Sequence, residues 1–552
     1  MMCLKYRFLF LYLLQICSVF ANENIQIECD SISNTDFGRR FCFIRHMNNR
    51  TFHKVTFKPN PIADEKRELI FDNCTIDALP LGFFEYFPNI RTVYAWNIKL
   101  QNVSKEAFRN GNALAVLDLS KNHIGTLVEH AFSLAKQLIE LHLSKNLIQS
   151  IHVNAFSGLG QLNILNLDHN RLQLIPANCF DSLTQLKTIR LSHNSIKMIP
   201  VELFGQNVRL QDIHLNDNAI EWMFGELTFR HLSYVNKFDL HNNPNANPGC
   251  CVINAESIDI RNTNSKGCYI GSRTKQVLAN NNGITFIDSN DATLANLEHI
   301  ELANNRLEKM QNLTRFNKMT YLDLMNNSIN DIDLTSFANM HRLEVLNLRN
   351  SGLSKIQFGM FSHKSKLKLL DISYNWLRNI NFQMFVSMKS LRKLHLDGNN
   401  LNKIDAAEIR KTLPSLSKIS ISENDWSCHN LASIIKYLES NGIELDSVDL
   451  TKDTENIKGV PCTTDIDNST NSEVIPKGNG IGVTSNEPDE KNYATSTPTS
   501  TDMGDKKYCD RSLDAFHMYL TQRLLELKYD IQNSIQSVTE AAKKLEYLLN
   551  LS

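Results

Sequence analysis

An asparagine recurs every 24 residues in the centre of this chain, and this period constrains the fold more than any other feature. It stands at the same place in successive segments of the form apolar-x-Leu-x-x-Asn-x-apolar. The asparagines of the first five segments are Asn122, Asn146, Asn170, Asn194 and Asn218. A fixed period of this length indicates one structural unit that is repeated and stacked, because a unit so short cannot bury its apolar face alone.

These segments follow the pattern L-x-x-L-x-L-x-x-N-x-L of the leucine-rich repeat. Each repeat should supply one short strand with alternate apolar residues turned inward, while the asparagine hydrogen-bonds backbone groups that the turn leaves unpaired. The sequence therefore predicts an α/β leucine-rich-repeat solenoid, a horseshoe with a parallel β-sheet on its concave face. About 16 repeats fit residues 67–427, and they are shorter and irregular near 244–282, where we expect a change of curvature.

The segments outside the repeats have distinct compositions. Residues 1–21 resemble a signal peptide, with Lys5 and Arg7 ahead of an apolar run. Residues 22–66 and 428–462 are expected to be caps that cover the ends of the solenoid. Residues 463–507 are rich in Ser, Thr and Asn, which predicts a disordered linker, and 508–552 form the last segment. No later run is long and apolar enough for a membrane span.

The last segment predicts an amphipathic, coiled-coil-like helix that needs a partner, because its apolar residues recur every three or four positions. The proposed oligomerisation residues are Leu513, Phe516, Leu520, Leu524, Leu527, Ile531, Ile535, Val538, Leu545 and Leu549. Cys509 directly precedes this helix and is a candidate for an interchain disulfide. The alternative is that Cys509 pairs with a spare cysteine inside the chain.

The 12 cysteines suit an oxidising compartment. Cys29 with Cys42, and Cys428 with Cys462, predict disulfides in the two caps. One of Cys250 and Cys251 is expected to bond to Cys268, and which of the two remains open. The repeat register places two further cysteines, Cys74 and Cys179, at buried positions, where we expect reduced thiols.

Three short segments resemble one family. The sequence Asn424-Asp-Trp-Ser-Cys428 precedes an apolar helix, Cys74-Thr-Ile-Asp-Ala-Leu-Pro80 opens the repeats, and Tyr508-Cys509 precedes the terminal helix. In these places the chain resembles the mosquito leucine-rich-repeat immune proteins, particularly the Anopheles-Plasmodium-responsive members. The resemblance implies a haemolymph protein that forms disulfide-linked dimers with itself or a second such protein and carries a complement-like thioester protein to microbial or parasite surfaces.

One polar cluster on the predicted concave face is a candidate ligand-binding site. Side chains at equivalent positions of adjacent repeats lie about 4.8 Å apart, so they can touch. The candidate residues are His142, His169, His193, His214, Asp217 and His241. A polar or pH-sensitive binding patch is one interpretation, and ordinary solvated strand residues are the other.

The sequence also predicts glycosylation in a secreted protein, at Asn-x-Ser/Thr motifs. The acceptors are Asn49, Asn73, Asn102, Asn312, Asn326, Asn468 and Asn550. Neither a catalytic motif nor a metal or cofactor motif is present, so we expect no enzyme, no cofactor and no metal. The net charge of −1 gives no support for nucleic-acid binding.

The function that these features favour is a secreted, extracellular protein of innate immunity. It would bind a complement-like thioester protein or a pathogen surface through the repeats and oligomerise through the terminal helix. The alternative is an extracellular adhesion protein that binds a receptor or a matrix component.

Overall fold

The computed structural model describes residues 27–29, 42–48, 68–223, 229, 231–246, 255–289, 296–310, 313–329, 332–446 and 455–464. All of them belong to the first of two compact units, Met1–Asp465, and the second unit is Ile466–Ser552. Several predictions lie outside the described residues: the signal peptide, most of the linker, the C-terminal helix with Cys509, the pair Cys250 and Cys251, and the acceptors Asn49, Asn312, Asn468 and Asn550.

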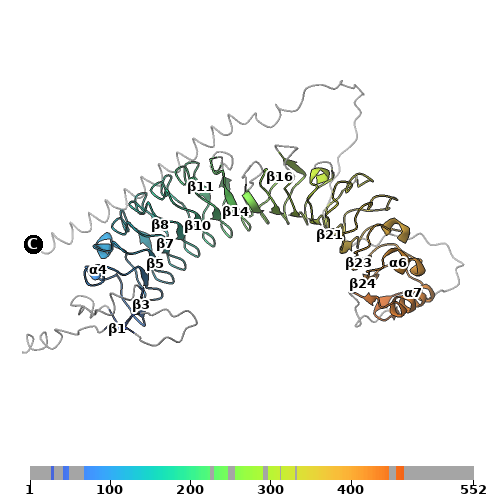
Figure 1. Cartoon of the computed structure of the whole chain (residues 1–552), viewed down its shortest axis with the longest axis horizontal. Coiled ribbons are helices and arrows are strands. Elements are labelled where there is room, and N and C mark those ends of the chain that lie inside the picture. Colours follow the sequence, from blue (N-terminus) through green and yellow to red (C-terminus); the bar gives the residue numbers. More distant parts are fainter. Residues whose placement is uncertain are drawn as a thin grey trace, which may run out of the picture. The chain divides into compact units, whose positions relative to one another are not determined.

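A 19-stranded sheet forms the inner face of a curved solenoid (Figure 1). Its strands pair in parallel and in register from β2 onward, and only β1 and β2 are antiparallel. In the order of pairing they are β1 (Ile27–Cys29), β2 (Cys42–Arg45), β3 (Glu68–Asp72), β4 (Thr92–Tyr94), β5 (Val116–Asp118), β7 (Glu140–His142), β9 (Ile164–Asn166), β10 (Thr188–Arg190), β12 (Asp212–His214), β14 (Val235–Asp239), β15 (Ala255–Asp259), β17 (Gln276–Leu278), β19 (His299–Glu301), β20 (Tyr321–Asp323), β21 (Val345–Asn347), β22 (Leu369–Asp371), β23 (Lys393–His395), β24 (Lys418–Ser420) and β25 (Glu444–Leu445). The predicted leucine-rich-repeat solenoid is confirmed.

The inner strands are short, and most expose their first and third residues while burying the second, as in β5 and β20. This alternation follows from the two-residue period of a strand. It fixes which side chains a partner can reach from the concave face.

The ladder asparagines join each repeat to the one before it. Asn146 accepts a hydrogen bond at Oδ1 from Ile124 N (3.1 Å) and donates from Nδ2 to Leu119 O (2.9 Å) and Leu143 O (3.0 Å). One carboxamide thus satisfies backbone groups of two repeats that would otherwise be buried without partners. The same bond to the preceding repeat is made by Asn122, Asn146, Asn170, Asn194, Asn218, Asn243, Asn282, Asn305, Asn327, Asn375, Asn399 and Asn424.

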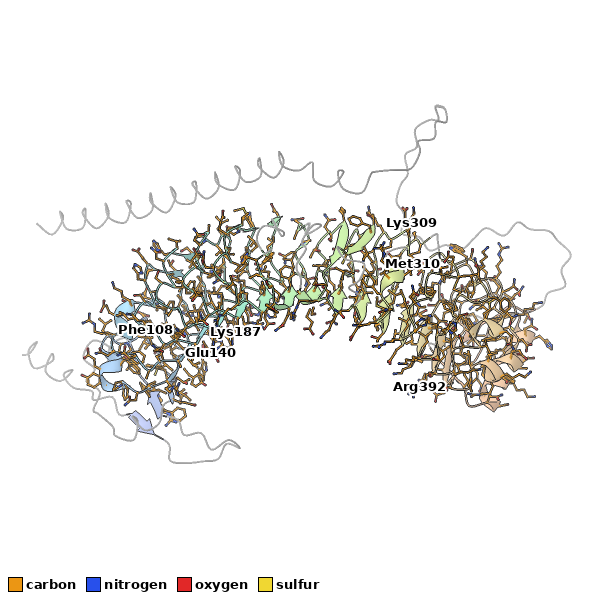
Figure 2. The ribbon with its side chains drawn as sticks, turned by 45° about the horizontal axis from the view of Figure 1, so that its top comes forward. Phe108, Glu140, Lys187, Lys309, Met310 and Arg392 are labelled. Atoms are coloured by element: carbon orange, nitrogen blue, oxygen red, sulfur yellow. A yellow bond between two sulfur atoms is a disulfide. The ribbon has the colours of Figure 1, made fainter. Side chains whose placement is uncertain are left out.

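The outer side of the coil is built from turns, short helices and two-stranded pairs. The pairs are β6 (Thr126–Leu127) with β8 (Ser150–Ile151), β11 (Met198–Ile199) with β13 (Trp222–Met223), and β16 (Gly267–Ile270) with β18 (Phe286–Ser289). The helical segments within the repeats are α4 (Phe83–Tyr86), η1 (Lys105–Phe108), η2 (Leu313–Arg315), η3 (Phe382–Phe385) and α6 (Ala406–Thr412). Figure 2 places Lys309 on this outer side and Glu140 on the sheet side.

Phenylalanines fill the core behind these turns in two stacked rows, with neighbouring ring centroids 5.7–6.3 Å apart. The first row is Phe84, Phe108, Phe132, Phe156, Phe180, Phe204 and Phe229, and the second is Phe337, Phe361 and Phe385. The shorter repeats lie between the two rows, and Leu313, which is buried, occupies the position of the phenylalanine there. The sheet nevertheless continues through them without a break.

Secondary structure is described in both of the expected cap segments. At the C-terminal end, α7 (Cys428–Ser440) buries Leu431, Ile434, Ile435 and Leu438, and β26 (Asn456–Ile457) pairs with β27 (Val460–Pro461). The predicted disulfide between Cys428 and Cys462 is present. At the other end, the antiparallel register of β1 and β2 sets the Cα atoms of Cys29 and Cys42 opposite each other. A bond between these two cysteines stays a prediction.

The predicted disulfide of Cys268 is wrong, because Cys268 is a free thiol. It lies on β16 and is only 2% exposed, so its side chain is buried in the core. Burial raises the pKa of this thiol to about 12. Cys74 and Cys179 are free and buried, as expected.

Candidate binding surface on the concave face

One backbone position of each repeat has a left-handed conformation, directly before the ladder asparagine. Its φ is 57° at Lys121, 55° at His169, 55° at Asp217 and 57° at Asn304. Asparagine, aspartate, histidine and glycine tolerate this conformation better than β-branched residues do. We call this series of residues the left-handed column. It explains why polar residues succeed one another along this edge of the sheet.

Three predicted residues meet in the left-handed column. The rings of His169 and His193 are stacked, with centroids 4.2 Å apart and an interplanar angle of 6°. His193 Nε2 lies 3.5 Å from Asp217 Oδ2. Asp217 also accepts hydrogen bonds from Asn242 Nδ2 (2.8 Å) and Asn216 Nδ2 (2.6 Å). These side chains therefore form one continuous chain of contacts across four repeats.

A second group lies on the sheet beside it. His241 Nδ1 is 2.5 Å from Asp239 Oδ1 and 3.5 Å from Asp259 Oδ2, while its Nε2 is 3.7 Å from Asp217 Oδ2. His214 Nδ1 approaches Asp239 Oδ2 at 3.9 Å. His241 thus joins the two groups into what we call the His–Asp patch: His169, His193, His214, Asp217, Asp239, His241 and Asp259.

The pKa values of His169 and Asp239 in the His–Asp patch are both lowered, which favours a neutral imidazole and an ionised carboxyl group. Burial, and then the neighbouring imidazole of His193, lower the pKa of His169, so its neutral form is favoured. Burial opposes ionisation of Asp239, but hydrogen bonds from His214 and His241 outweigh it and hold the pKa of that carboxyl well below its usual range. The patch therefore presents fixed negative charge beside imidazoles.

The structure brings five of the six predicted residues into the His–Asp patch. The exception is His142, which lies on β7 beside Glu140, with Nε2 3.4 Å from Oε2 of the glutamate. Asp239 and Asp259 were missed by the sequence argument. The signal was available, because each is the last residue of its strand and Asp239 lies two positions before His241, on the same face.

Asp239, His241 and Asp259 each offer one ligand atom within 4.8 Å of the others, so the three could in principle contact a metal ion. Two cations already balance these carboxylates. Arg261 donates to both oxygens of Asp259 (2.9 and 2.6 Å), and Lys237 Nζ lies 3.4 Å from Asp239 Oδ2. We therefore describe the group as an ion-pair network.

A second series of asparagines in the left-handed column forms a further ladder, which the sequence argument also missed. Asn304 donates to Asn281 Oδ1 (2.6 Å), Asn326 to Asn304 Oδ1 (2.5 Å) and Asn350 to Asn326 Oδ1 (2.9 Å). One of these, Asn326, is a predicted glycosylation acceptor whose amide is thus engaged. Two other acceptors, Asn73 and Asn102, are exposed.

Aromatic side chains are exposed at two other places on the solenoid. Tyr94 and Trp96 make an edge contact at 5.4 Å. Tyr374 lies beneath the guanidinium of Arg349 at 3.8 Å, and Trp376 is 51% exposed. Such residues often anchor protein interfaces.

A small pocket of about 170 Å³ on the outer side is lined by Phe286, Leu307 and Lys309, among others. Sites for small molecules are usually larger, at about 300–1,000 Å³. The extended inner surface is therefore a better candidate for binding a macromolecule than this pocket is for binding a small molecule. No helix among the described residues has the length and apolar character needed to cross a bilayer.

These features define a leucine-rich-repeat solenoid, a class of extended scaffold that binds other proteins on a curved sheet. The family model for the leucine rich repeat matches residues 88–144, 136–196, 317–375 and 341–401. No curated protein sequence matches the chain.

Several solved structures share the fold. A chain of the LRIM1/APL1C complex is 18% identical and has a TM-score of 0.53, and the match covers 96% of this chain and 81% of that one. The leucine-rich repeat domain of APL1 is 18% identical with a TM-score of 0.50, covering 77% and 98%. A leucine-rich-repeat protein of Leptospira interrogans is 20% identical with a TM-score of 0.54, covering 72% and 94%. At these identities the likeness shows the fold alone.

Proposed function

We propose that this chain is a secreted recognition and scaffold protein of innate immunity, which binds another protein through its concave face. The observation that carries the proposal is the His–Asp patch on an uninterrupted inner sheet, where charged side chains are held in fixed positions and open to solvent on one side. Polar groups arranged in this way favour a specific partner, because their hydrogen bonds and charges must be matched.

The resemblance to mosquito immune proteins supports a narrower proposal, that the partner is a complement-like thioester protein. The residues behind it are Asn424-Asp-Trp-Ser-Cys428 and the Cys509–helix junction. The buried Trp426 donates from Nε1 to Ile421 O (2.7 Å) beside the cap disulfide, so this motif has a structural role in closing the solenoid. An adhesion protein that binds a receptor or a matrix component is the alternative.

The test is capture from mosquito haemolymph with the full chain and with Asp217→Lys as bait. Lysine already occupies the left-handed column at Lys121 and Lys145, so this substitution fits the backbone while it reverses the charge. The matched control is Gln149→Lys, an exposed position away from the patch. We expect the wild type and the control to enrich a protein whose thioester reacts with labelled methylamine, and the Asp217→Lys bait to retain less than a tenth of it.

Capture of membrane receptors or matrix components without any methylamine-reactive protein would contradict the immune proposal and favour the adhesion alternative. Equal capture by Asp217→Lys and Gln149→Lys would remove the His–Asp patch from the binding site.

We further propose that the chain oligomerises through its C-terminal segment, with Cys509 forming an interchain disulfide. Two helices that pair along an apolar stripe would hold their Cys509 thiols close together. On non-reducing gels the wild type should migrate as a dimer and Cys509→Ser as a monomer. Equal mobility of the two would contradict the disulfide.

A further inference from the structure

A second surface on the concave face differs in character from the His–Asp patch and lies over β19 to β22. The first residues of three adjacent strands are apolar and half-exposed: Tyr321, Val345 and Leu369. The ring of His299 extends this row by stacking on Tyr321 at 4.2 Å. Three apolar side chains in direct succession on a solvent-facing sheet form a contact strip of the kind that interfaces use.

Carboxylates lie beside this apolar row, at the third residue of the strands. Glu301 pairs in register with Asp323, and Asp371 lies two strands further on, with Asn347 between them. His299 Nε2 lies 3.0 Å from Glu301 Oε1, but among the described residues neither lysine nor arginine forms an ion pair with these three carboxylates. In the His–Asp patch, by contrast, Arg261 pairs with Asp259 and Lys237 with Asp239. The negative charge of Asp323 and Asp371 is therefore left for a partner to balance.

The surroundings of Asp323 disfavour the ionised form of its carboxyl group. Burial raises the pKa of its carboxyl, and the neighbouring charges of Glu301 and Asp371 raise it further. Its Oδ1 accepts a hydrogen bond from Met325 N (3.0 Å). A cation placed over the carboxylates would relieve the repulsion, since an opposite charge favours the ionised form.

The geometry of the row selects one kind of secondary structure. Side chains in the row repeat every ~4.8 Å, so three strands span roughly 10 Å. An extended peptide repeats its side chains on one face only every ~6.8 Å, which does not match. A helix lying along the row presents residues i, i+3 or i+4, and i+7 over roughly 10.5 Å, which matches the span of the three strands.

We propose that the surface over β19 to β22 binds an amphipathic helix of a partner protein, with apolar residues at i, i+3 or i+4 and i+7 over Tyr321, Val345 and Leu369, and with lysines or arginines along one side over Glu301, Asp323 and Asp371. This inference rests on the proposed use of the concave face for protein binding, and it does not depend on the immune role.

The test uses the full chain and a fluorescein-labelled, 20-residue leucine–lysine helical peptide, followed by fluorescence anisotropy. The comparison peptide has glutamate in place of every lysine. We expect the lysine peptide to bind at least 10-fold more tightly than the glutamate peptide, and its affinity to fall as salt is raised from about 50 to 200 mM.

Two variants locate the binding. The double substitution Asp323→Asn and Asp371→Asn keeps the acceptors for Met325 N and Ser373 N, so the fold is retained while the charge is lost. It should weaken binding of the lysine peptide at least 10-fold. The matched control is Asp212→Asn, on the same face but at β12, which should change the affinity less than 2-fold. Equal melting temperatures would verify folding.

Equal binding of the lysine and glutamate peptides would overturn the proposal. So would an equal loss of affinity in the double variant and in Asp212→Asn, because it would mean diffuse attraction to acidic surface. Capture of the thioester protein by the unaltered chain, together with failure of the peptide experiment, would reject this inference and leave the proposed function standing.

Discussion

At the scale of single residues, the ladder position requires a side chain that both donates and accepts hydrogen bonds. Asparagine does so in most repeats, and two of its substitutes, Ser351 and Thr263, show what is lost without it. Ser351 bonds only weakly to the preceding repeat, with Oγ 3.4 Å from Leu324 O. Thr263 donates to Ile260 O in its own repeat (2.8 Å), and within the described residues its side chain does not reach the repeat before it. The ladder is therefore weakened at Thr263, in one of the short repeats.

Replacing a ladder asparagine should cost more than a usual surface substitution. In Asn146→Ala the amide of Ile124 loses its partner inside the protein, and the carbonyls of Leu119 and Leu143 each lose one of two donors, because Asn122 and Asn170 also donate to them. Unsatisfied buried groups cost about 1–3 kcal/mol each, so we expect a loss of about 2–4 kcal/mol in the free energy of unfolding. Chemical denaturation measures this, with exposed Gln149→Ala as a control that should stay within about 0.5 kcal/mol. A near-neutral Asn146→Ala would refute the ladder's role.

Lys364 is a buried cation in a place where neighbouring repeats have methionine. It is 1% exposed, its Nζ donates to Ser362 O (3.0 Å), and the residues one repeat away are Met340 and Met388, both fully buried. Burial lowers the pKa of Lys364 to about 8. Keeping it charged in the folded protein at pH 7 therefore costs energy, on the order of 3 kcal/mol for a shift of this size.

We expect Lys364→Met to raise the free energy of unfolding at pH 7 by about 1–3 kcal/mol. Because the folded pKa lies below that of the unfolded chain, the unfolded state binds more protons between about pH 8 and 10.5, so the wild type should gain stability with rising pH in that window. The variant should lack this gain, so the difference in the free energy of unfolding between the variant and the wild type should become smaller as the pH rises. Denaturation at pH 7 and 10 checks this, and the exposed Lys366→Met should show no such pH dependence.

At the scale of the repeat, the sequence predicted the strands well, because the asparagine of each repeat fixes the positions of its strand and its buried side chains. From Asn122 the inward leucines, the strand and the buried phenylalanine follow by counting. It was also possible to place His169, His193 and Asp217 side by side. These predictions depend only on the period of 24 residues. Residues 24 positions apart in the sequence lie side by side in the fold.

Features that depend on side-chain direction or backbone torsion could not be predicted in the same way. The disulfide of Cys268 was inferred from proximity in sequence, but the direction of β16 turns that thiol into the core. The second asparagine ladder needs the positive φ of Asn281 and Asn304, which no residue pattern states directly. Likewise, Asp239 and Asp259 end their strands outside the left-handed column, so the pattern of that column did not indicate them as ionic partners of His241.

The left-handed column can be tested by substitution at Asn304, whose φ is 57°. Valine should lower the free energy of unfolding by about 1–3 kcal/mol, because a β-branched residue is strained there and the hydrogen bonds to Asn281 and Asn326 are lost. Glycine loses the same bonds without the strain, so it should cost less than half as much. If denaturation shows equal losses for valine and glycine, the backbone conformation does not determine the residue type.

At the scale of the whole described unit, stability should behave as a sum over neighbouring repeats, since each repeat contacts mainly those beside it. The two phenylalanine rows are separate, and between them the ladder lacks a side-chain hydrogen bond from Thr263 to the preceding repeat. The caps oppose local unfolding of the terminal repeats. Unfolding at one end does not need to spread through the middle of the solenoid. A defect in one cap should therefore remain near that cap.

The cap disulfide provides the test. Cys428 and Cys462 are separated by 34 residues, and closing a loop of that length is worth about 3–4 kcal/mol in the chain-entropy model. Replacing both by serine should destabilise α7 and the adjoining β24, because the helix covers the last repeat with Leu431 and Ile435 and would detach more often. Hydrogen exchange should show faster exchange over 418–445, with residues 116–214 unchanged. Uniform acceleration along the solenoid would contradict nearest-neighbour behaviour and indicate that the repeats unfold together.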